Sequence, residues 1–387
     1  MALKGKYRLE REGICVEQKP PGGDIVDTIA SMWGRVQARL FPMLEACLDE
    51  PATSKLRQLI GILEVVRIEE FVGLPLGGRG RPQCDRKALA RAFVAKAVYN
   101  LPTTELLVEL LRGQPNLRQV CGFPRRQDVP SAATFSRAFA EFATCGLADR
   151  VHETLLAQHL SGVQFENIAR DSTEIVAREK PQPATPPEPK IPRPRGRRPQ
   201  GAPPPEPRKR LERQVQQTPA QALAELPRGC TRGCKRDSHG HAHYWIGYKA
   251  HLDVTDTMLP ISLVTTSAHV HDSQVAIPLA RLSAQRVTAQ YELMDAGYDA
   301  QLVWQAVQDL GHAPIIELQP RHHYRPALTA ADKDRLHARS AVERVNARLK
   351  DEFGARHVRV RGHAKVHAHL MFGLLALFAD QLLKLVT

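Results

Sequence analysis

Three acidic residues that are far apart in the sequence stand where their side chains could meet. Asp171 and Asp295 each follow a short apolar segment bounded by turn residues, which is the pattern of a buried strand. Glu343 lies in a segment with helical spacing. Because ligands bind outside the carboxyl ends of the strands in open α/β sheets, we expect the two aspartates to lie at such an edge.

Three carboxylates at one place repel one another unless divalent cations hold them, and such hard oxygen ligands suit magnesium or manganese. Two such ions are a standard device for displacement at phosphorus. Taken singly, Asp171 fits a turn or capping role and Asp295 fits a loop acid before Gly297. Taken together with Glu343, the two aspartates favour a two-metal site.

Glu343 lies within a predicted helix that spans Asp334 to Lys350. Residues three or four positions apart share a helix face, and on the face of Glu343 one acid stands in a row of polar and basic residues. The alternative interpretation is a solvated face of salt bridges. The polar face consists of Arg339, Glu343, Asn346 and Lys350, and a rough apolar stripe consists of Leu336, Val342, Val345 and Leu349.

The contexts of these acids resemble the signature regions of the DDE transposases of bacterial insertion sequences, in the broad group that includes the IS4 and IS5 families. The shared features are Asp171-Ser-Thr, Leu-Met-Asp295-Ala-Gly-Tyr-Asp, and Arg-x3-Glu343-x6-Lys. The resemblance implies that these three acids hold two magnesium or manganese ions on a ribonuclease H-like fold. One position departs from the extended IS4 signature, which has a tyrosine where this chain has Leu336.

Basic and aromatic side chains near the acids are candidate DNA contacts. Arg339 and Lys350 lie on the same predicted helix as Glu343, where they would grip phosphates beside the scissile bond. The string Trp-x-Gly-Tyr-Lys-x-His resembles the second strand of the same transposase core. Its Trp245 could stack on an unpaired base, although a core aromatic residue is the commoner role. The candidate DNA-binding residues are Arg339, Lys350, Arg344, Lys249 and Trp245.

The predicted elements between residues 160 and 387 run strand, hairpin, helix, strand, helix, strand and helix. Right-handed crossovers in this order place the first and fourth strands side by side, which would bring Asp171 to Asp295. We therefore expect an α/β ribonuclease H-like catalytic core, with a mixed five-stranded sheet flanked by helices. The predicted strands are 163–170, 244–254, 259–265, 291–294 and 314–318, and the predicted helices between them are 273–282 and 299–310.

Residues 1–150 form a predicted all-helical N-terminal domain. Apolar periodicity runs through residues 24–72, and Pro102 with the threonines that follow is a good helix start. Short helices with compact polar turns and basic residues favour a helix-turn-helix-like DNA-binding domain, and a purely structural helical cap is the alternative. The clearest predicted helices are 85–99, one opened by 101–104, and 132–142, which exposes Arg137.

The chain has a formal net charge of +13 and a pI near 9.6, which favours a polyanionic partner, either nucleic acid or an acidic membrane surface. The most apolar stretch, 370–379, is too short to span a bilayer and predicts a buried C-terminal helix. A proline- and arginine-rich insertion at about 178–228 is predicted to be disordered, because a run with so many prolines cannot bury a core. This insertion would be either a non-specific phosphate clamp or a solvated linker.

Seven cysteines, an odd number scattered over 387 residues, fit a reducing cytoplasm better than a disulfide framework. Cys230 and Cys234 precede His239, His241 and His243, a set that could bind zinc, but the spacing matches no standard zinc finger. The histidines could instead line a substrate groove. The sequence leaves this choice open.

These features together predict a transposase that cuts and joins DNA at insertion-sequence ends. The resemblance implies double-stranded DNA with terminal inverted repeats and a target DNA as partners, and catalysis at two ends favours a homodimer on DNA. Two alternatives stay open. One is a decayed or domesticated DNA-binding regulator that does not cut, and the other is a ribonuclease H-like nuclease that never joins strands.

Overall fold

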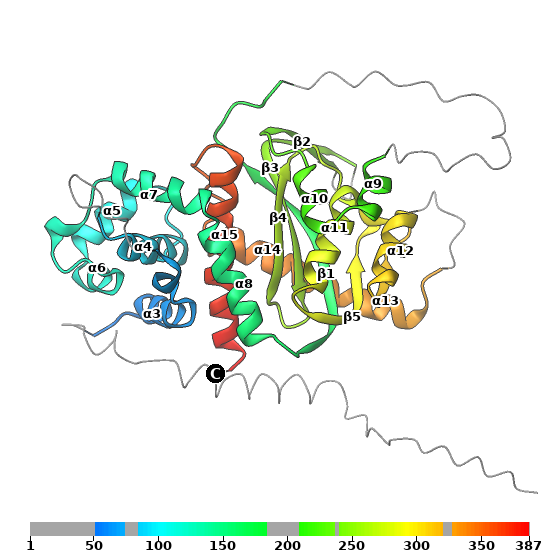
Figure 1. The fold of residues 1–387 in the computed structure, drawn as a ribbon, viewed down its shortest axis with the longest axis horizontal. Helices are drawn as coiled ribbons and strands as arrows, with labels where there is room; N and C mark the ends of the chain where they lie inside the picture. Colours follow the sequence, from blue (N-terminus) through cyan, green and yellow to red (C-terminus); the bar gives the residue numbers. More distant parts are fainter. Residues whose placement is uncertain (1–50, 74–83, 184–208, 237–239, 320–326, 387) are drawn as a thin grey trace, which may run out of the picture.

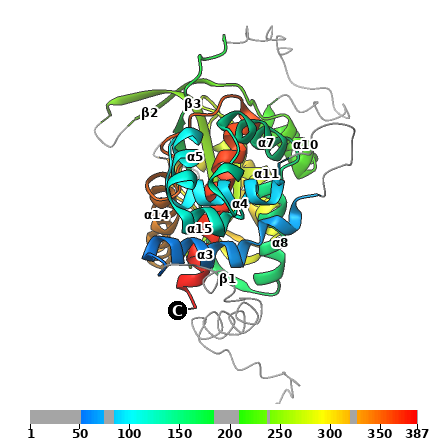
Figure 2. The same cartoon turned by 90° about the vertical axis from the view of Figure 1, so that its left-hand side faces the viewer.

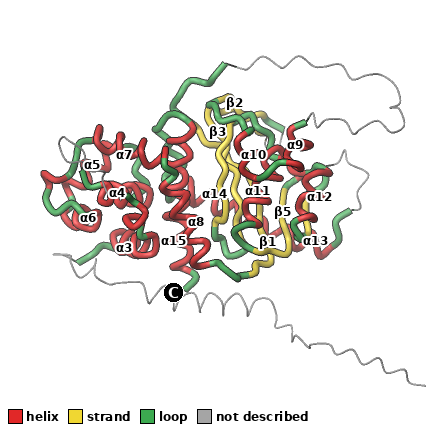
Figure 3. Tube along the Cα trace, viewed as in Figure 1, coloured by secondary structure: helices red, strands yellow, loops and turns green. Residues whose placement is uncertain are grey.

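The structure, a computed structural model, places a group of helices on one side and a sheet with its own helices on the other (Figure 1). Two helices, α8 (Leu147–His159) and α15 (His363–Lys384), lie between these parts (Figure 1). Coloured by element type, the strands gather in one half of the molecule (Figure 3). Residues 184–208 of the predicted proline-rich insertion, the periodic segment before residue 51, and His239 lie outside the described residues. The described residues are 51–73, 84–183, 209–236, 240–319 and 327–386.

Six α-helices precede the sheet in the described part of the chain. Two predicted starts are confirmed by caps: the side chain of Asp85 accepts from the Lys87 N–H at 2.8 Å, and that of Thr103 from the Leu106 N–H at 3.2 Å. The helices α6 and α8 have no counterpart in the prediction. The bounds are α3 Ser54–Val66, α4 Arg86–Val98, α5 Thr104–Gly113, α6 Pro115–Cys121, α7 Ala132–Thr144 and α8 Leu147–His159.

The helix α15 is the element on which the two parts of the molecule meet. It packs against α3, α4, α7 and α8 on one side and against β4 (Pro260–Ser267) of the sheet on the other. The ring centroid of its Phe372 lies 5.8 Å from that of Phe93 on α4. By length and composition α15 would suffice to cross a membrane, but most of its residues are buried in this packing. The predicted buried C-terminal helix is confirmed, and one hydrophobic core runs from the helices to the sheet.

Six described strands form one mixed sheet, five of which follow the predicted order. The strand β1 pairs antiparallel with β3 and parallel with β5, β4 pairs with β3, and β6 pairs with β5. The helices α11 and α12 cover one face, and α14 and α15 cover the other (Figure 1). This arrangement is consistent with the predicted ribonuclease H-like core. The bounds are β1 Gln164–Val176, β3 Ala242–Thr255, β4 Pro260–Ser267, β5 Thr288–Met294, β6 Ala313–Ile316, α11 Ser273–Ala284, α12 Gln301–Asp309 and α14 Ser340–Asp351.

Five strands were predicted, and the structure adds a sixth, β2 (Thr231–Arg236). It pairs with residues 242–247 of β3 in a hairpin that reaches beyond the rest of the sheet (Figure 2). At Gly247, where β3 leaves this hairpin, a Cβ would lie 2.0 Å from the carbonyl oxygen of Ile175. Only glycine fits such an approach of two backbones. Because β2 has no apolar alternation of its own, its pairing with β3 was not predictable from local pattern.

The predicted disordered insertion ends earlier than expected. Residues 210–216 and 219–224 form two short helices, α9 (Arg210–Gln216) and α10 (Pro219–Ala224), which pack on α11. Gln214 is buried and donates to the carbonyl oxygen of Gln274 at 2.7 Å. Arg281 of α11 donates to the carbonyl oxygen of Gln214 at 2.8 Å. The prediction of disorder to residue 228 is wrong because these helices are stabilised by packing on α11, which composition does not reveal.

A buried group of charges ties three neighbouring strands together. Arg170 on β1 is fully buried and donates two hydrogen bonds to Asp253 on β3, each at 2.7 Å. The same guanidinium lies 3.0 Å from a carboxylate oxygen of Glu292 on β5. Ser283 of α11 donates to Asp253 at 2.6 Å. Because successive side chains of a strand point to opposite faces, Arg170 points toward α11 and the next residue, Asp171, points toward α14.

We expect Arg170→Met to lower the free energy of unfolding by about 3–5 kcal/mol, because it leaves two buried carboxylates without their cation. Urea unfolding at neutral pH would measure the loss. The control is Arg125→Met, since Arg125 forms a salt bridge with Asp128 at 3.2 Å while its side chain is 72% exposed. A pair of that kind is worth less than about 1 kcal/mol. Equal losses in the two variants would show that the buried network does not hold the strands together.

Candidate functional site

Asp171 lies on β1, and Asp295 directly follows β5, the parallel neighbour of β1, as predicted. The pairing of β1 with β5 ends at Ala169 and Leu293, so each aspartate lies two residues beyond the last paired residue of its strand. One detail differs from the prediction: β1 continues to Val176 because it still pairs with β3, so Asp171 lies within a strand rather than at its end. The two carboxylates therefore meet at the edge where β5 stops.

These carboxylates are close enough to affect each other. Burial, and after it the charge of Asp295, raise the pKa of the Asp171 carboxyl to about 6. Burial and the charge of Asp272 raise the pKa of Asp295, whose Oδ1 accepts a hydrogen bond from the Gly297 N–H at 2.9 Å. Neighbouring acids in this state are stabilised in their charged form by a bound cation.

Asp272 is a further acid at this place, and the sequence reasoning missed it. Its Oδ1 accepts a hydrogen bond from Lys249 Nζ at 3.0 Å and lies 3.7 Å from His251 Nδ1. Burial alone would raise the pKa of Asp272, but His251 and Lys249 hold it below its ordinary value. Two features of the sequence could have indicated it. Asp272 stands directly before a predicted helix, and Lys249 and His251, two residues apart, lie on one face of the predicted strand.

The hydroxyl of Tyr298 lies beside these acids. The side chain is fully buried, and its oxygen has no hydrogen-bond partner among the described residues. Burial and then the charges of Asp272, Asp171 and Asp295 raise its pKa above the ordinary value. A buried hydroxyl without a partner is rare in proteins and calls for an explanation. The three carboxylates that act on it are oxygen ligands, which hard divalent cations prefer.

The helix α14 presents its polar face to Asp171. Asn346 Nδ2 donates to Asp171 Oδ2 at 3.2 Å, and Arg339, directly before the helix, has its Nη1 4.0 Å from Asp171 Oδ1. Arg339 also donates to Glu343 Oε1 at 2.7 Å. Glu343 therefore lies on the predicted face, between two residues that reach Asp171. Its side chain is 54% exposed, and its carboxylate is paired with Arg339.

The donor chemistry fits a hard divalent cation, while the three predicted ligands do not converge. Asp171 and Asp295 would hold such an ion. Glu343 would join them only after its ion pair with Arg339 opened. Among the described residues, no three side chains of His, Cys, Asp or Glu are arranged to hold one metal ion.

Two family models match the chain, and both describe transposase domains. The model of the transposase DDE domain matches residues 214–379, and the model of a transposase domain called DUF772 matches residues 45–141. The two matches together cover more than half of the chain. The chain belongs to the DDE transposases. The DDE match contains Asp295 and Glu343 and begins after Asp171. No curated protein and no solved structure matches this transposase.

The other predicted DNA contacts of the transposase differ in their exposure and in the groups that they already contact. Arg344 is exposed on α14. Lys350 Nζ lies 3.9 Å from Glu174 Oε1, and its side chain is 17% exposed. Lys249 donates to the carbonyl oxygen of Val270 and to Asp272, each at 3.0 Å. Its ammonium therefore holds Asp272 in place rather than facing an open surface.

Trp245 is buried, with 6% of its surface exposed. Its indole N–H donates to the carbonyl oxygen of Tyr248 at 3.0 Å. Its ring lies against Gly233 of β2, where a Cβ would approach it to 2.3 Å. The prediction of base stacking by Trp245 is corrected, because β2, which was not predicted, covers the ring. The structure supports the alternative of a core aromatic residue.

The residues considered as zinc ligands belong to the same hairpin. The thiol of Cys230 is buried and donates to the carbonyl oxygen of Glu179 at 3.9 Å, while Cys234 is exposed in β2. The ring of His243 stacks on Trp245, with 6.4 Å between centroids. In the part of the chain that the structure describes, these side chains do not form a zinc site.

Proposed function

We propose that the transposase cuts DNA at the ends of an insertion sequence and joins the freed 3′ end to target DNA. The observation that carries the proposal is the meeting of Asp171 and Asp295 on adjacent parallel strands, with the polar face of α14 against them. Two hard cations bound there would stabilise the charge that develops on the phosphate during an in-line displacement.

The chain's own residues would position the acids and the DNA. Asn346 donates to Asp171 and fixes the orientation of that carboxylate. Arg339 lies between Asp171 and Glu343, so its guanidinium can leave one of these acids for a phosphate beside the scissile bond. Lys350 lies further along the same helix, where it would contact a neighbouring phosphate.

The helical part offers a second surface for DNA. Arg112, Arg125 and Arg126 line an open hollow between α5 and the turn that precedes α7. Arg137 is exposed on α7. Exposed cations on a small helical domain, three of them around one hollow, favour contact with phosphates, which supports a DNA-binding role for this part. A homodimer with one catalytic site at each end of the element would act on both ends together.

The test uses DNA from the flanks of the transposase gene, searched for inverted repeats. The protein is incubated with this DNA in magnesium, in manganese or in EDTA, and a pre-cut end is offered with a target plasmid. We expect metal-dependent cutting at the repeat boundary and joining of the pre-cut end. Binding to the repeat without cutting would favour the regulator, and cutting without joining would favour a nuclease.

A further inference from the structure

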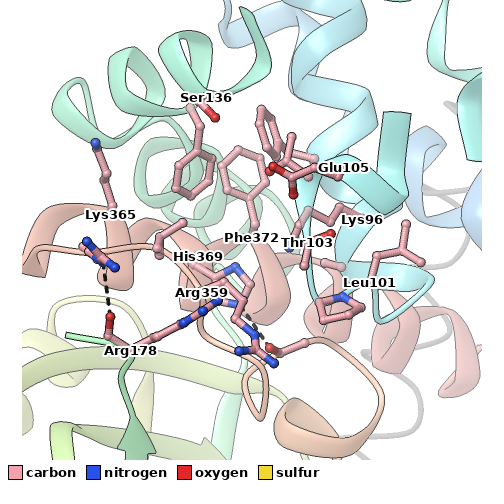
Figure 4. Close-up of a pocket in the computed structure, with 18 residues that line it drawn as sticks. Lys96, Leu101, Thr103, Glu105, Ser136, Arg178, Arg359, Lys365, His369 and Phe372 are labelled. Atoms are coloured by element: carbon pink, nitrogen blue, oxygen red, sulfur yellow. Dashed lines mark hydrogen bonds between the residues drawn. The ribbon is translucent and has the colours of Figure 1, made fainter. Parts of the chain in front are cut away.

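A basic cleft lies between the helical part and the C-terminal segment, away from the three acids. Its volume is about 440 Å³, within the range of pockets that hold small ligands. The ends of α4 and α5 form one wall, and the segment that leads into α15 forms the other (Figure 4). Buried rings of Phe93, Phe139 and Phe372 line it as well. None of the residues that define the acidic site lines this cleft.

Lys96 is the buried cation of the cleft. Its residue surface is 8% exposed, yet no hydrogen bond or ion pair holds its ammonium among the described residues. Burial lowers the pKa of Lys96 to about 8, while the charge of Glu105 raises it. The Lys96 nitrogen is not one of the buried atoms that lack a partner, so it is accessible from the cleft. An anion bound in the cleft would add to the charge of Glu105 in stabilising the ammonium.

The start of α5 adds to the preference for an anion. Pro102, Thr103 and Thr104 line the cleft at the N-terminus of this helix, beside Lys96 (Figure 4). Helix N-termini carry partial positive charge, which favours phosphate groups. At this end the Thr103 side chain already accepts from the Leu106 N–H, so the donors left for a ligand are the earlier N–H groups of the first turn. Lys96 and this helix end come from the same part of the molecule and converge on the same space.

Four exposed cations surround the mouth of the cleft, from the opposite wall. No acidic side chain forms an ion pair with any of them in the described residues, and the backbone carbonyl of Arg178 accepts from Arg361 Nε at 3.2 Å. Among the lining residues Glu105 is the only acid, so five cations face one carboxylate. This excess of positive charge favours a ligand with several consecutive phosphates over a single small anion. The four cations are Arg178, Arg359, Arg361 and Lys365.

We infer that this cleft binds the sugar-phosphate backbone of a DNA strand, with Lys96 on one phosphate and Arg359 and Arg178 on its neighbours. Arg178 follows β1, the strand that carries Asp171. At about 3.3 Å per residue, the Cα atoms of Arg178 and Asp171 are at most roughly 23 Å apart. A strand of a few nucleotides held in the cleft would be long enough to reach the acids. The inference rests on the proposed function only in taking DNA as the substrate.

The test measures binding of a fluorescent single strand and a fluorescent duplex by anisotropy, in EDTA and over a range of sodium chloride concentrations. Lys96→Met and Arg359→Gln are each expected to weaken binding several-fold. Each should also lower the slope of log K against log salt by about 0.7 for the single strand, as one lost phosphate contact does. The matched control is Arg57→Gln on α3, which removes one exposed charge outside the cleft and should leave the slope unchanged.

Wild-type affinity and slope in both cleft variants would overturn the inference. If Lys96→Met fails to fold, as judged by its melting temperature, Arg359→Gln decides, because that side chain is exposed. Inorganic phosphate and a nucleoside triphosphate serve as competitors. If either displaces the strand as well as an unlabelled strand does, the cleft is a site for small phosphates and not for DNA. Because the assay contains no metal, failure of cutting and failure of this inference are distinguishable.

Discussion

Replacing Asp295 with asparagine is expected to reduce metal-dependent cutting by at least about a thousandfold, the scale observed when one member of a catalytic unit is removed. Asparagine keeps the shape of aspartate but loses the charge that a divalent cation requires. The Asp171→Asn variant should lose as much, because the two carboxylates meet at one edge of the sheet. Cleavage of the inverted-repeat DNA in single-turnover conditions measures the loss.

The same variant should fold and bind DNA normally. Asp171 and Asp272 both lie close enough to Asp295 to interact with its charge, so removal of one charge relieves repulsion. We therefore expect a melting temperature that is unchanged or slightly raised, and DNA affinity no weaker than that of the wild type. The control is Asp309→Asn at the exposed end of α12, which should cut at the wild-type rate. Rapid cutting by Asp295→Asn in both magnesium and manganese would contradict the assignment.

The meeting of Asp171 and Asp295 was predictable because it follows from topology. Two strands joined by right-handed crossovers become parallel neighbours, and residues just beyond their pairing must then be close. The helix starts at Asp85 and Thr103 were predictable because capping is local. The capping side chain accepts a hydrogen bond from an N–H only two or three residues later.

Features that depend on distant partners were not predictable in this way. Asp272, directly before α11, is held at the site by Lys249 of β3, which donates to it. Trp245 is buried because β2 lies over it, and β2 owes its existence to pairing with β3. The order of α9 and α10 depends on α11 in the same manner. In each case the contact joins two segments that are distant in the sequence, and the residue pattern of neither segment predicts the contact.

The role of Glu343 can be tested by comparison with Glu352, at the other end of α14. Two arginine–glutamate pairs of the same i,i+4 spacing lie at the two ends of this helix: Arg339 with Glu343 at 2.7 Å and Arg348 with Glu352 at 3.1 Å. Both glutamates are about half exposed, at 54% and 46%. Pairs of this kind stabilise a helix by about 0.3–0.5 kcal/mol each. As structural elements the two glutamates are therefore nearly equivalent.

They differ in their neighbours, because only the pair with Arg339 adjoins Asp171. We expect Glu343→Gln to cut DNA at least about a hundredfold more slowly than the wild type, a loss of about 2.7 kcal/mol in transition-state stabilisation. Glu352→Gln should cut normally, and both variants should unfold at nearly the same urea concentration. Comparable activity in the two variants would mean that Arg339 and Glu343 form a solvated salt bridge, and that the acids of the site are Asp171, Asp295 and Asp272. A loss confined to Glu343→Gln would mean that its carboxylate leaves Arg339 during the reaction, which frees the guanidinium for the DNA phosphate.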